Sequence, residues 1–386
     1  MGYLKKIGDK KFRIMYDVPW MNGKRRQKTE TLVRTTKRHA EAILAEREAA
    51  VVRGECATSG DVRMNELFDR FMQVKAERLA PATLHRYDGL LGVYLRPAFG
   101  TRKAGSIRAT DLVSAYSQWA RRPISGRTVR HAADLMRNVL NRAVKWGILP
   151  RNPATLLDND DLPKVVKPES TVLTEAELRQ LLAEAQRPAL RSQARGYLCA
   201  HSAFYPALAF AAFTGARQGE VLAVRWRDVD FAEGSVTISR SLTDSPRARL
   251  TFKLPKNDKP RTICISSQLV RILQSHRVVQ EAEKIAFGTA YRDQDLVFTK
   301  PDGSPIAPWS FSSAFRDFVK RSAVRRIRFH DLRDTHASLL AKAGVPIEVI
   351  SKRLGHSSIG VTVDRYVTVY RDRDAAAAEA FEQLMT

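Results

Sequence analysis

Six residues between positions 217 and 366 carry side chains that together can cleave a phosphodiester. They are Arg217, Lys256, His330, Arg333, His356 and Tyr366. Two guanidinium groups can hold both non-bridging oxygens of one phosphate, because their planar forks suit bidentate contact. Two histidines and a lysine supply further donors, and a tyrosine hydroxyl can attack phosphorus. The set therefore predicts covalent cleavage of a nucleic-acid backbone.

The sequence favours a reaction that needs no metal. Its carboxylates are scattered, and His330 and His336 are six residues apart, unlike the histidines of a HExxH zinc site. Fixed arginine charges can stabilise the charge on a phosphoryl-transfer transition state in place of metal ions. We therefore expect no metal ligands and no cofactor.

Local spacing predicts how several of these groups are held. Arg217 stands at an expected helix start, with Glu220 one turn later to hold its guanidinium group. His330 and Arg333 are three residues apart, so a helix would place them on one face. The tyrosine needs a base, because its reference pKa is about 10. His330 and His356 are both available, and the sequence does not distinguish between them.

The net charge of +24 predicts a polyanionic partner. Residues 1–60, 61–165 and 166–386 are each net basic, so the charge is not confined to a tail. Phosphate contacts would relieve the self-repulsion of such a surface and release condensed counterions. Nucleic acid is thus the leading partner on charge alone, and a cationic surface without that role is the alternative.

The elements that must position the six residues fall into several domains, because 386 residues exceed one compact core. We predict boundaries at 1–60, 61–155, 156–170 and 171–386. The stretch 156–170 is rich in proline and acidic residues and is expected to be an extended linker. A capping box at Thr174–Glu177 is expected to open the last domain, and Arg187 to His201 is expected to form a loop.

The first segment is predicted to form a basic β-hairpin followed by a helix. Alternating apolar residues indicate a half-buried strand: Phe12, Ile14, Tyr16 and Val18. Asn22-Gly23 is a turn signal, and Thr36 can cap a helix that runs to about Arg53. A basic hairpin can enter a DNA groove. The candidate DNA-binding residues are Lys24, Arg25, Arg26 and Lys28.

Residues 61 to about 153 are predicted to be entirely helical. Apolar residues at helical spacing mark three core stripes: Leu67, Phe68, Phe71 and Met72; Leu84, Tyr87, Leu91, Tyr94 and Leu95; and Val129, Ala133, Met136, Val139, Leu140 and Ala143. Pro97 and Gly100 are expected to end the second helix, and Asp111 to cap the next. The candidate DNA-binding residues are Arg127, Arg130 and Arg137, although helix surfaces are often simply charged.

Two further segments bear on the site. Ala248 to Leu254 and Thr262 to Ile265 are expected to pair as a hairpin around Lys256. Ala375 to Ala378 favour a terminal helix, in which Phe381, Leu384 and Met385 share one stripe.

Cysteine usage and hydropathy fit a cytoplasmic protein. The three cysteines are isolated, without a disulfide framework, and fit a reducing compartment: Cys56, Cys199 and Cys264. No stretch has the length and hydropathy of a membrane span, and the start lacks the apolar run of a signal peptide.

The order of these motifs closely resembles the tyrosine recombinases, the phage integrase family. The resemblance rests on Thr214–Glu220, His330-Asp331-Leu332-Arg333, Leu354-Gly355-His356 and Tyr366 ten positions later. It implies an arm-type DNA-binding domain at 1–60, a helical core-binding domain at 61–155 and a mixed α/β catalytic domain at 171–386 with a C-terminal tail. It also assigns Lys256 to protonation of the departing 5′ oxygen, with Lys259 as the competing choice.

The resemblance further implies a prokaryotic protein that is associated with the nucleoid when active, and it implies a reaction and its partners. Tyr366 would attack the scissile phosphate, form a 3′-phosphotyrosyl link and free a 5′ hydroxyl that later rejoins a partner strand. Two rounds of exchange pass through a four-way (Holliday) junction, which implies a homotetramer on two double-stranded attachment sites, aided by DNA-bending proteins. The alternatives are a type IB topoisomerase and a non-catalytic DNA-binding regulator. The attachment sites, the directionality, and a phage or conjugative origin are left open.

Overall fold

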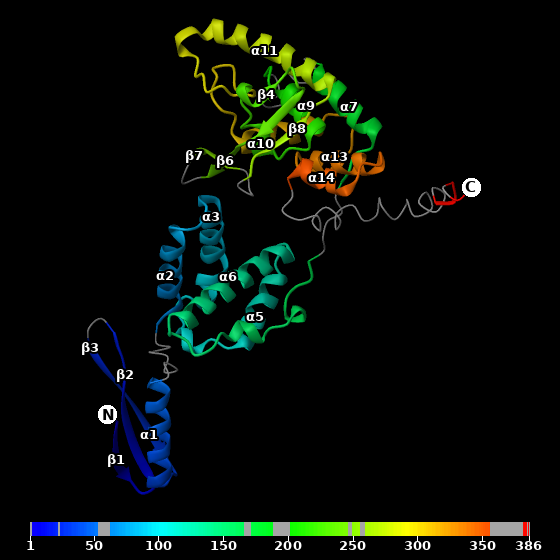
Figure 1. The fold of residues 1–386 in the computed structure, drawn as a ribbon. Helices are drawn as coiled ribbons and strands as arrows, with labels where there is room; N and C mark the ends of the chain where they lie inside the picture. The colour runs from blue at the N-terminus through cyan, green and yellow to red at the C-terminus, as the bar shows by residue number, and fades with distance from the viewer. Residues whose placement is uncertain are drawn as a thin grey trace. The chain divides into compact units, whose positions relative to one another are not determined.

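The computed structural model describes residues 2–21, 24–52, 62–165, 171–187, 201–245, 249–254, 259–355, 381–383 and 385. The chain divides into two compact units, Met1–Lys167 and Pro168–Thr386 (Figure 1).

The N-terminal elements are an antiparallel sheet and one helix. Strands β1 (Tyr3–Gly8), β2 (Lys11–Met21) and β3 (Lys24–Val33) lie in that order, and α1 (Lys37–Val52) packs on β2. Phe12, Ile14 and Tyr16 are buried, as the alternation predicts. The capping by Thr36 is also confirmed, because its hydroxyl accepts from the His39 amide at 3.3 Å.

One strand of this sheet was not predicted. Strand β1 has a mostly exposed, lysine-rich sequence that lacks clear alternation, so only its pairing with β2 marks it as a strand. Met21 pairs with Lys24 across the predicted turn, and Asn22-Gly23 itself lies outside the described residues.

The helical part of the first unit is built around a long amphipathic helix, α6 (Gly126–Lys145). The other elements are α2 (Met64–Ala76), α3 (Pro81–Leu90), a π-helical segment (Leu91–Leu95), α4 (Arg96–Phe99) and α5 (Ala109–Ala120). The six apolar residues predicted on α6 are all buried, and those on α2 and Tyr87 of α3 pack into the same core. Leu84 of α3 is also buried. The all-helical prediction is therefore confirmed.

Two helix boundaries differ from the prediction. Pro97 lies inside α4, because the π-helical turn before it shifts the hydrogen-bond pattern just ahead of the proline. Gly100 does end that helix, but with a right-handed φ of −54°. A Cβ atom there would lie 2.3 Å from Oδ1 of Asn65, so close packing requires the glycine. Asp111 is the third residue of α5 and accepts from the Arg108 amide at 2.8 Å.

The segment after α6 is not extended chain where it is described. Pro153–Leu156 and Asn159–Asp161 form 3-10 turns, and Leu157 is buried in the helical core. Arg130 donates to the carbonyl of Pro163 at 2.9 Å. These contacts attach residues up to 163 to the helical unit, whereas residues 166–170 lie outside the described part.

The second unit is centred on α9 (Phe204–Thr214), which contacts α7 (Glu175–Gln186), α11 (Ser267–Phe287) and α13 (Asp331–Lys342). Helix α9 is apolar on nearly every side, which is typical of a helix buried in a domain core. The predicted capping box is present, since the Thr174 hydroxyl accepts from the Glu177 amide at 3.2 Å. The described residues of this unit also form the helices α10 (Gln218–Val221), α12 (Pro308–Val319) and α14 (Ile347–Leu354).

Two small antiparallel sheets complete this unit. The first sheet has the order β4 (Val229–Asp230), β5 (Ser235–Ile238) and β8 (Arg261–Cys264). The second pairs β6 (Ser241–Ser245) with β7 (Arg249–Lys253). The unit thus combines helices with small sheets.

The predicted hairpin of β7 with β8 is therefore wrong. Strand β7 pairs with the adjacent β6, because a short loop closes at low entropic cost. Strand β8 instead adds to β5, where Val236 and Ile263 pair in the core. The chain between Leu254 and Lys259 consequently connects two sheets, and Lys256 on it lies outside the described residues.

Candidate active site

Arg217 stands at a sharp reversal of the chain between α9 and α10. Gly215 ends α9 with a φ of 66°, a left-handed conformation that glycine adopts without strain. A Cβ atom on Gly215 would lie 2.6 Å from Leu354 and 2.8 Å from His336. Glycine is thus required both by the turn and by the close packing of α14 and α13 against it.

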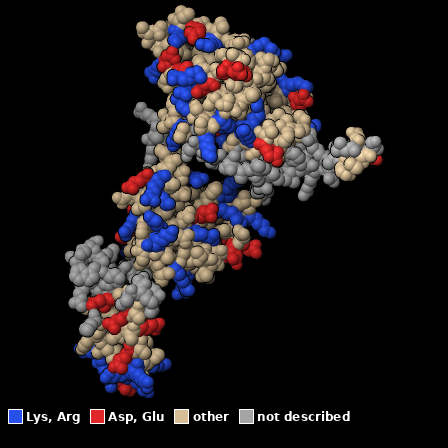
Figure 2. All heavy atoms as spheres, in the orientation of Figure 1, with Lys and Arg blue, Asp and Glu red and all other residues tan. Residues whose placement is uncertain are grey.

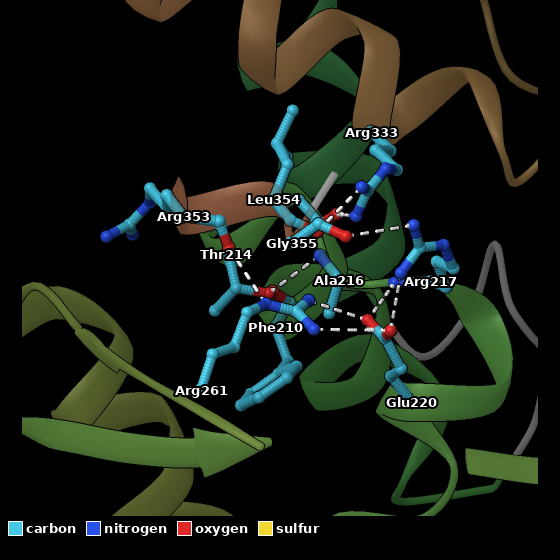
Figure 3. A network of polar contacts seen from close by, with 11 residues as sticks. Phe210, Thr214, Ala216, Arg217, Glu220, Arg261, Arg333, Arg353, Leu354 and Gly355 are labelled. Atoms are coloured by element: carbon cyan, nitrogen blue, oxygen red, sulfur yellow. Dashed lines mark hydrogen bonds and ion pairs between the residues drawn. The ribbon is translucent and has the colours of Figure 1, made fainter. Parts of the chain in front are cut away.

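Glu220 lies in α10, three residues after Arg217, and its carboxylate is the counter-charge of the Arg217 guanidinium group (Figure 3). Its side chain is 1% exposed, and its Oε1 accepts from Nη1 of Arg217 at 2.8 Å. Its Oε2 accepts from the Arg217 backbone amide at 3.0 Å. The contact that the sequence predicts between these two residues is therefore present.

A second arginine, Arg261 at the start of β8, shares the same carboxylate. Nη2 of Arg261 donates to Oε2 of Glu220 at 2.7 Å, and its Nη1 donates to Oε1 at 3.3 Å. Burial alone would raise the pKa of Glu220, but the hydrogen bonds and charge of Arg261, followed by those of Arg217, outweigh burial and lower it. Glu220 is held as a carboxylate between two cations.

Three arginines converge on the C-terminal end of α14. Nε of Arg261 donates to the carbonyl of Arg353 at 2.9 Å. Nη2 of Arg333 donates to the carbonyl of Leu354 at 2.7 Å. Nη2 of Arg217 donates to the carbonyl of Gly355 at 3.3 Å. The last carbonyls of a helix have no partner within the helix and carry its negative dipole end, so cations stabilise them.

Arg333 joins this helix end to the turn that carries Arg217. It lies in α13, is 2% exposed, and donates from Nη1 to the carbonyl of Gly215 at 2.7 Å. His330 is the residue before α13 and is exposed, and its carbonyl accepts from the Arg333 amide at 3.1 Å. The structure thus brings Arg217, Arg333 and Glu220 together, with His330 one turn from Arg333.

His336, also in α13, is a neutral imidazole that supports the same region. A carbonyl can only accept, so Nδ1 carries the proton that is shared with Ala212 at 2.9 Å. Nε2 then accepts from Nε of Arg353 at 3.1 Å. Burial, followed by the charge of Arg353, lowers the pKa of His336 to about 4. Arg353 also donates to the carbonyls of Phe213 and Cys264.

Sequence reasoning missed Arg261, Arg353 and His336 as parts of this network. Arg353 directly precedes the Leu354-Gly355-His356 motif, and Arg261 directly precedes an alternating strand, but such positions also suit exposed arginines. Only the strand pairing of β8 brings Arg261 to Glu220. The predicted Lys256, His356 and Tyr366 lie outside the described residues, whereas Lys259 is described and exposed.

The candidate DNA-binding residues of the first unit differ in their contacts. Lys28 on β3 and Arg127 on α6 are exposed, and the side chains of Lys24, Arg25 and Arg26 lie outside the described part. Figure 2 shows basic side chains gathered on the visible face of the helical elements. This distribution suits phosphate contact.

Two of the predicted DNA-binding arginines contact their own chain. Arg130 donates to Pro163 at 2.9 Å and to Asn159 at 3.3 Å, and Arg137 donates to the carbonyl of Leu157 at 3.5 Å. Both side chains are half-buried, and they fasten the segment after α6. A DNA contact by either residue stays a prediction.

The arrangement around Glu220 is suited to binding a phosphate. Arg217 is 26% exposed, and its two described side-chain contacts use two of the five donors of a guanidinium group. Glu220 offsets only one of the two cations that it contacts, so positive charge remains. Preorganised cations of this kind stabilise charge that develops on phosphoryl oxygens.

The described residues also bear on metal binding and on membrane insertion. Within them, no group of three or more histidine, cysteine or acidic side chains is placed to hold a metal ion. None of the described helices combines the length and the hydropathy that crossing a bilayer requires.

Residues 171–373 match the sequence profile of the phage integrase family, and the chain belongs to that family, the tyrosine recombinases. The XerC-like tyrosine recombinase of Caldanaerobacter subterraneus subsp. tengcongensis is 27% identical over 368 residues, which cover 90% of each chain. The ICEBs1 integrase of Bacillus subtilis is 28% identical over 172 residues, 45% of this chain and 46% of that protein.

Solved integrase structures share the fold. The Tn1549 transposon integrase in complex with transposon right end DNA matches with a TM-score of 0.69 at 17% identity, over 82% of this chain and 100% of that one. A lambda integrase tetramer bound to a Holliday junction matches with a TM-score of 0.58 at 16% identity, over 92% of this chain and 95% of that one. The fold and the family together define an enzyme of site-specific recombination.

Proposed function

We propose that this recombinase integrates or excises a mobile DNA element by cleaving and rejoining strands through a 3′-phosphotyrosyl intermediate on Tyr366. The observation that carries the proposal is the convergence of Arg217 and Arg333 on the carbonyls of Gly355 and Leu354. That helix end directly precedes His356 and lies eleven residues before Tyr366, within the part of the chain that matches the family profile.

In the proposed reaction, the two arginines bind the non-bridging oxygens of the scissile phosphate and stabilise the charge that develops there. The Tyr366 oxygen forms a bond to phosphorus while its proton passes to His330 or His356. The bond from phosphorus to the 5′ oxygen breaks, and Lys256, or Lys259, supplies the proton to that oxygen. The bond energy is retained in the phosphotyrosyl ester, so a 5′ hydroxyl can reverse the reaction without a nucleotide cofactor.

The rest of the chain is proposed to select and hold DNA. Residues 1–60 would bind arm sites, 61–155 core sites, and 171–386 would carry the chemistry, with 156–170 between them. The structural relatives support this, since they include an integrase in complex with transposon end DNA and an integrase tetramer bound to a Holliday junction. A homotetramer on two attachment sites follows, and DNA-bending proteins would assist it.

The test uses the full chain and duplex DNA from the borders of the element that encodes it. Wild-type protein should form a covalent adduct that maps to Tyr366, with and without EDTA. Tyr366→Phe removes one oxygen, so it should bind the same DNA with unchanged affinity and form no adduct. An adduct in Tyr366→Phe would identify another nucleophile, strict magnesium dependence would overturn the metal-free reaction, and relaxation of any supercoiled plasmid would indicate a topoisomerase.

A further inference from the structure

We propose that Arg261 is a positioning residue for cleavage, which acts by fixing the place of the Arg217 guanidinium group. The proposal rests on the proposed function, because it concerns the geometry of the same phosphate site. Arg261 does not belong to the set of six, and its side chain is 11% exposed.

Arg217 and Arg261 share one carboxylate, that of Glu220. Each oxygen of Glu220 accepts one hydrogen bond from Arg217 and one from Arg261. The paired bonds from Arg261 fix the plane of the carboxylate, and that plane fixes where Nη1 of Arg217 can lie. Without Arg261, Glu220 would keep one cation and gain freedom to rotate.

Arg217 and Arg261 also share a backbone target, the C-terminal end of α14. Arg261 also donates to the carbonyl of Arg353, two residues before the Gly355 carbonyl that Arg217 contacts. A Cβ atom on Gly355 would lie 3.0 Å from Nη1 and 3.1 Å from Cδ of Arg261. The side chain of Arg261 therefore lies directly against Gly355. Both groups that hold Arg217, the carboxylate and the helix end, are held in turn by Arg261.

The contacts of Arg261 depend on the planar shape of its guanidinium group. Arg261 donates from Nε, Nη1 and Nη2 in one plane, to a helix carbonyl on one side and to a carboxylate on the other. A lysine ammonium is a point charge and cannot reproduce this fork. The arrangement thus depends on arginine itself, beyond its charge.

The experiment compares Arg261→Met and Arg261→Lys with the wild-type full chain in single-turnover adduct formation on border DNA. Small displacements of a catalytic group cost large factors in rate. Arg261→Met should therefore lose on the order of ten- to a hundredfold in the cleavage rate, by analogy with a disturbed oxyanion donor. The cleavage rate of Arg261→Lys should lie between those of wild type and Arg261→Met. The DNA affinity of both variants should stay within about twofold of the wild-type affinity, because contacts elsewhere on the DNA are unchanged.

Arg225→Met is the matched control. Arg225 lies in the same unit and makes a two-bond ion pair with Asp228, at 2.9 and 3.0 Å, without a described contact to α14. Arg225→Met removes an ion pair comparable to the one between Arg261 and Glu220. A general loss of stability should therefore appear in Arg225→Met as well as in Arg261→Met. A cleavage loss in Arg225→Met as large as in Arg261→Met would reduce Arg261 to a structural residue and overturn the proposal.

A double-mutant cycle with Arg217→Lys tests whether Arg261 affects the cleavage rate through Arg217. If Arg261 acts through Arg217, most of the loss from Arg261→Met should vanish when Arg217 is already lysine. Equal losses in the two backgrounds would contradict positioning. A wild-type rate in Arg261→Met would contradict it as well.

A readout without catalysis separates this proposal from the proposed function. Phenylglyoxal modification of Arg217, followed by peptide mass mapping, should be several-fold faster in Arg261→Met than in wild type or Arg225→Met. Unchanged reactivity would overturn the positioning role. Absence of any adduct in wild-type protein, together with faster modification of Arg217 in Arg261→Met, would refute the proposed function alone.

Discussion

At the scale of single residues, Arg217 depends on its shape as much as on its charge. Its guanidinium group contacts a carboxylate on one side and a helix-end carbonyl on the other while remaining partly exposed. Arg217→Lys keeps the charge and loses the fork. We expect a cleavage loss of on the order of a hundredfold or more with little change in DNA affinity. Single-turnover kinetics measure this, and a rate near that of wild type would make Arg217 structural.

His336 gives the protein a stability that depends on pH. Its pKa is lowered from 6.5 to about 4 in the folded chain, so the unfolded state binds a proton first as the pH falls. The native state is therefore fully favoured above pH 6.5 and is destabilised as the pH falls from 6.5 towards 4. The loss attributable to this group approaches about 3 kcal/mol at the lower end.

The measurement is the unfolding midpoint of the second unit between these pH values. His336→Asn keeps a donor near the Nδ1 position and cannot titrate, so its midpoint should fall less steeply than that of wild type. His276 and His201 are buried with lowered pKa values and contribute the same trend to both proteins, so the difference isolates His336. Parallel curves for the two proteins would show that His336 is not the titrating group.

At the scale of elements, the contact of α14 with the end of α9 is set by one glycine. Gly215→Ala places a methyl group at a φ of 66° and against Leu354 and His336. We expect a loss of about 3 kcal/mol in unfolding free energy, which combines left-handed strain with overpacking. Gly234→Ala is the control, because Gly234 has a φ of 55° and its nearest atom would be 3.5 Å away. That variant should lose only about 1 kcal/mol; equal losses in denaturant titrations would mean that strain alone matters.

The elements differ in how far the sequence predicts them. Helices such as α6 follow from apolar residues at a local spacing, and the turn of Arg217 onto Glu220 spans only three residues. Strand pairing is non-local, so the sequence around Lys256 is compatible with a hairpin that the structure does not form. The role of Arg261 depends on that pairing, because Glu220 is 41 residues away along the chain. No pattern in the residues around Arg261 therefore predicts its contact with Glu220.

At the scale of the whole molecule, the C-terminal segment is expected to act between protomers. Phe381 and Met385 are helical and exposed, and a short helix gains little stability unless its apolar stripe is buried. Deleting residues 375–386 should leave binding to one DNA site intact while weakening synapsis and recombination. Gel-shift and recombination assays measure the two effects, with the unfolding midpoint as a control. Normal recombination, or unfolding of the truncated chain, would refute this role.

The convergence of three arginines on the end of α14 also constrains when the site can form during synthesis. Their contacts with residues 353–355 span 92, 21 and 138 residues of chain for Arg261, Arg333 and Arg217. All three contacts involve residues 353–355, late in the second unit, so they form only after most of that unit has been synthesised. Tyr366, the proposed nucleophile, lies eleven residues further along the chain and is therefore synthesised after them. In the proposed reaction, the groups that bind the phosphate are thus synthesised before the group that attacks it.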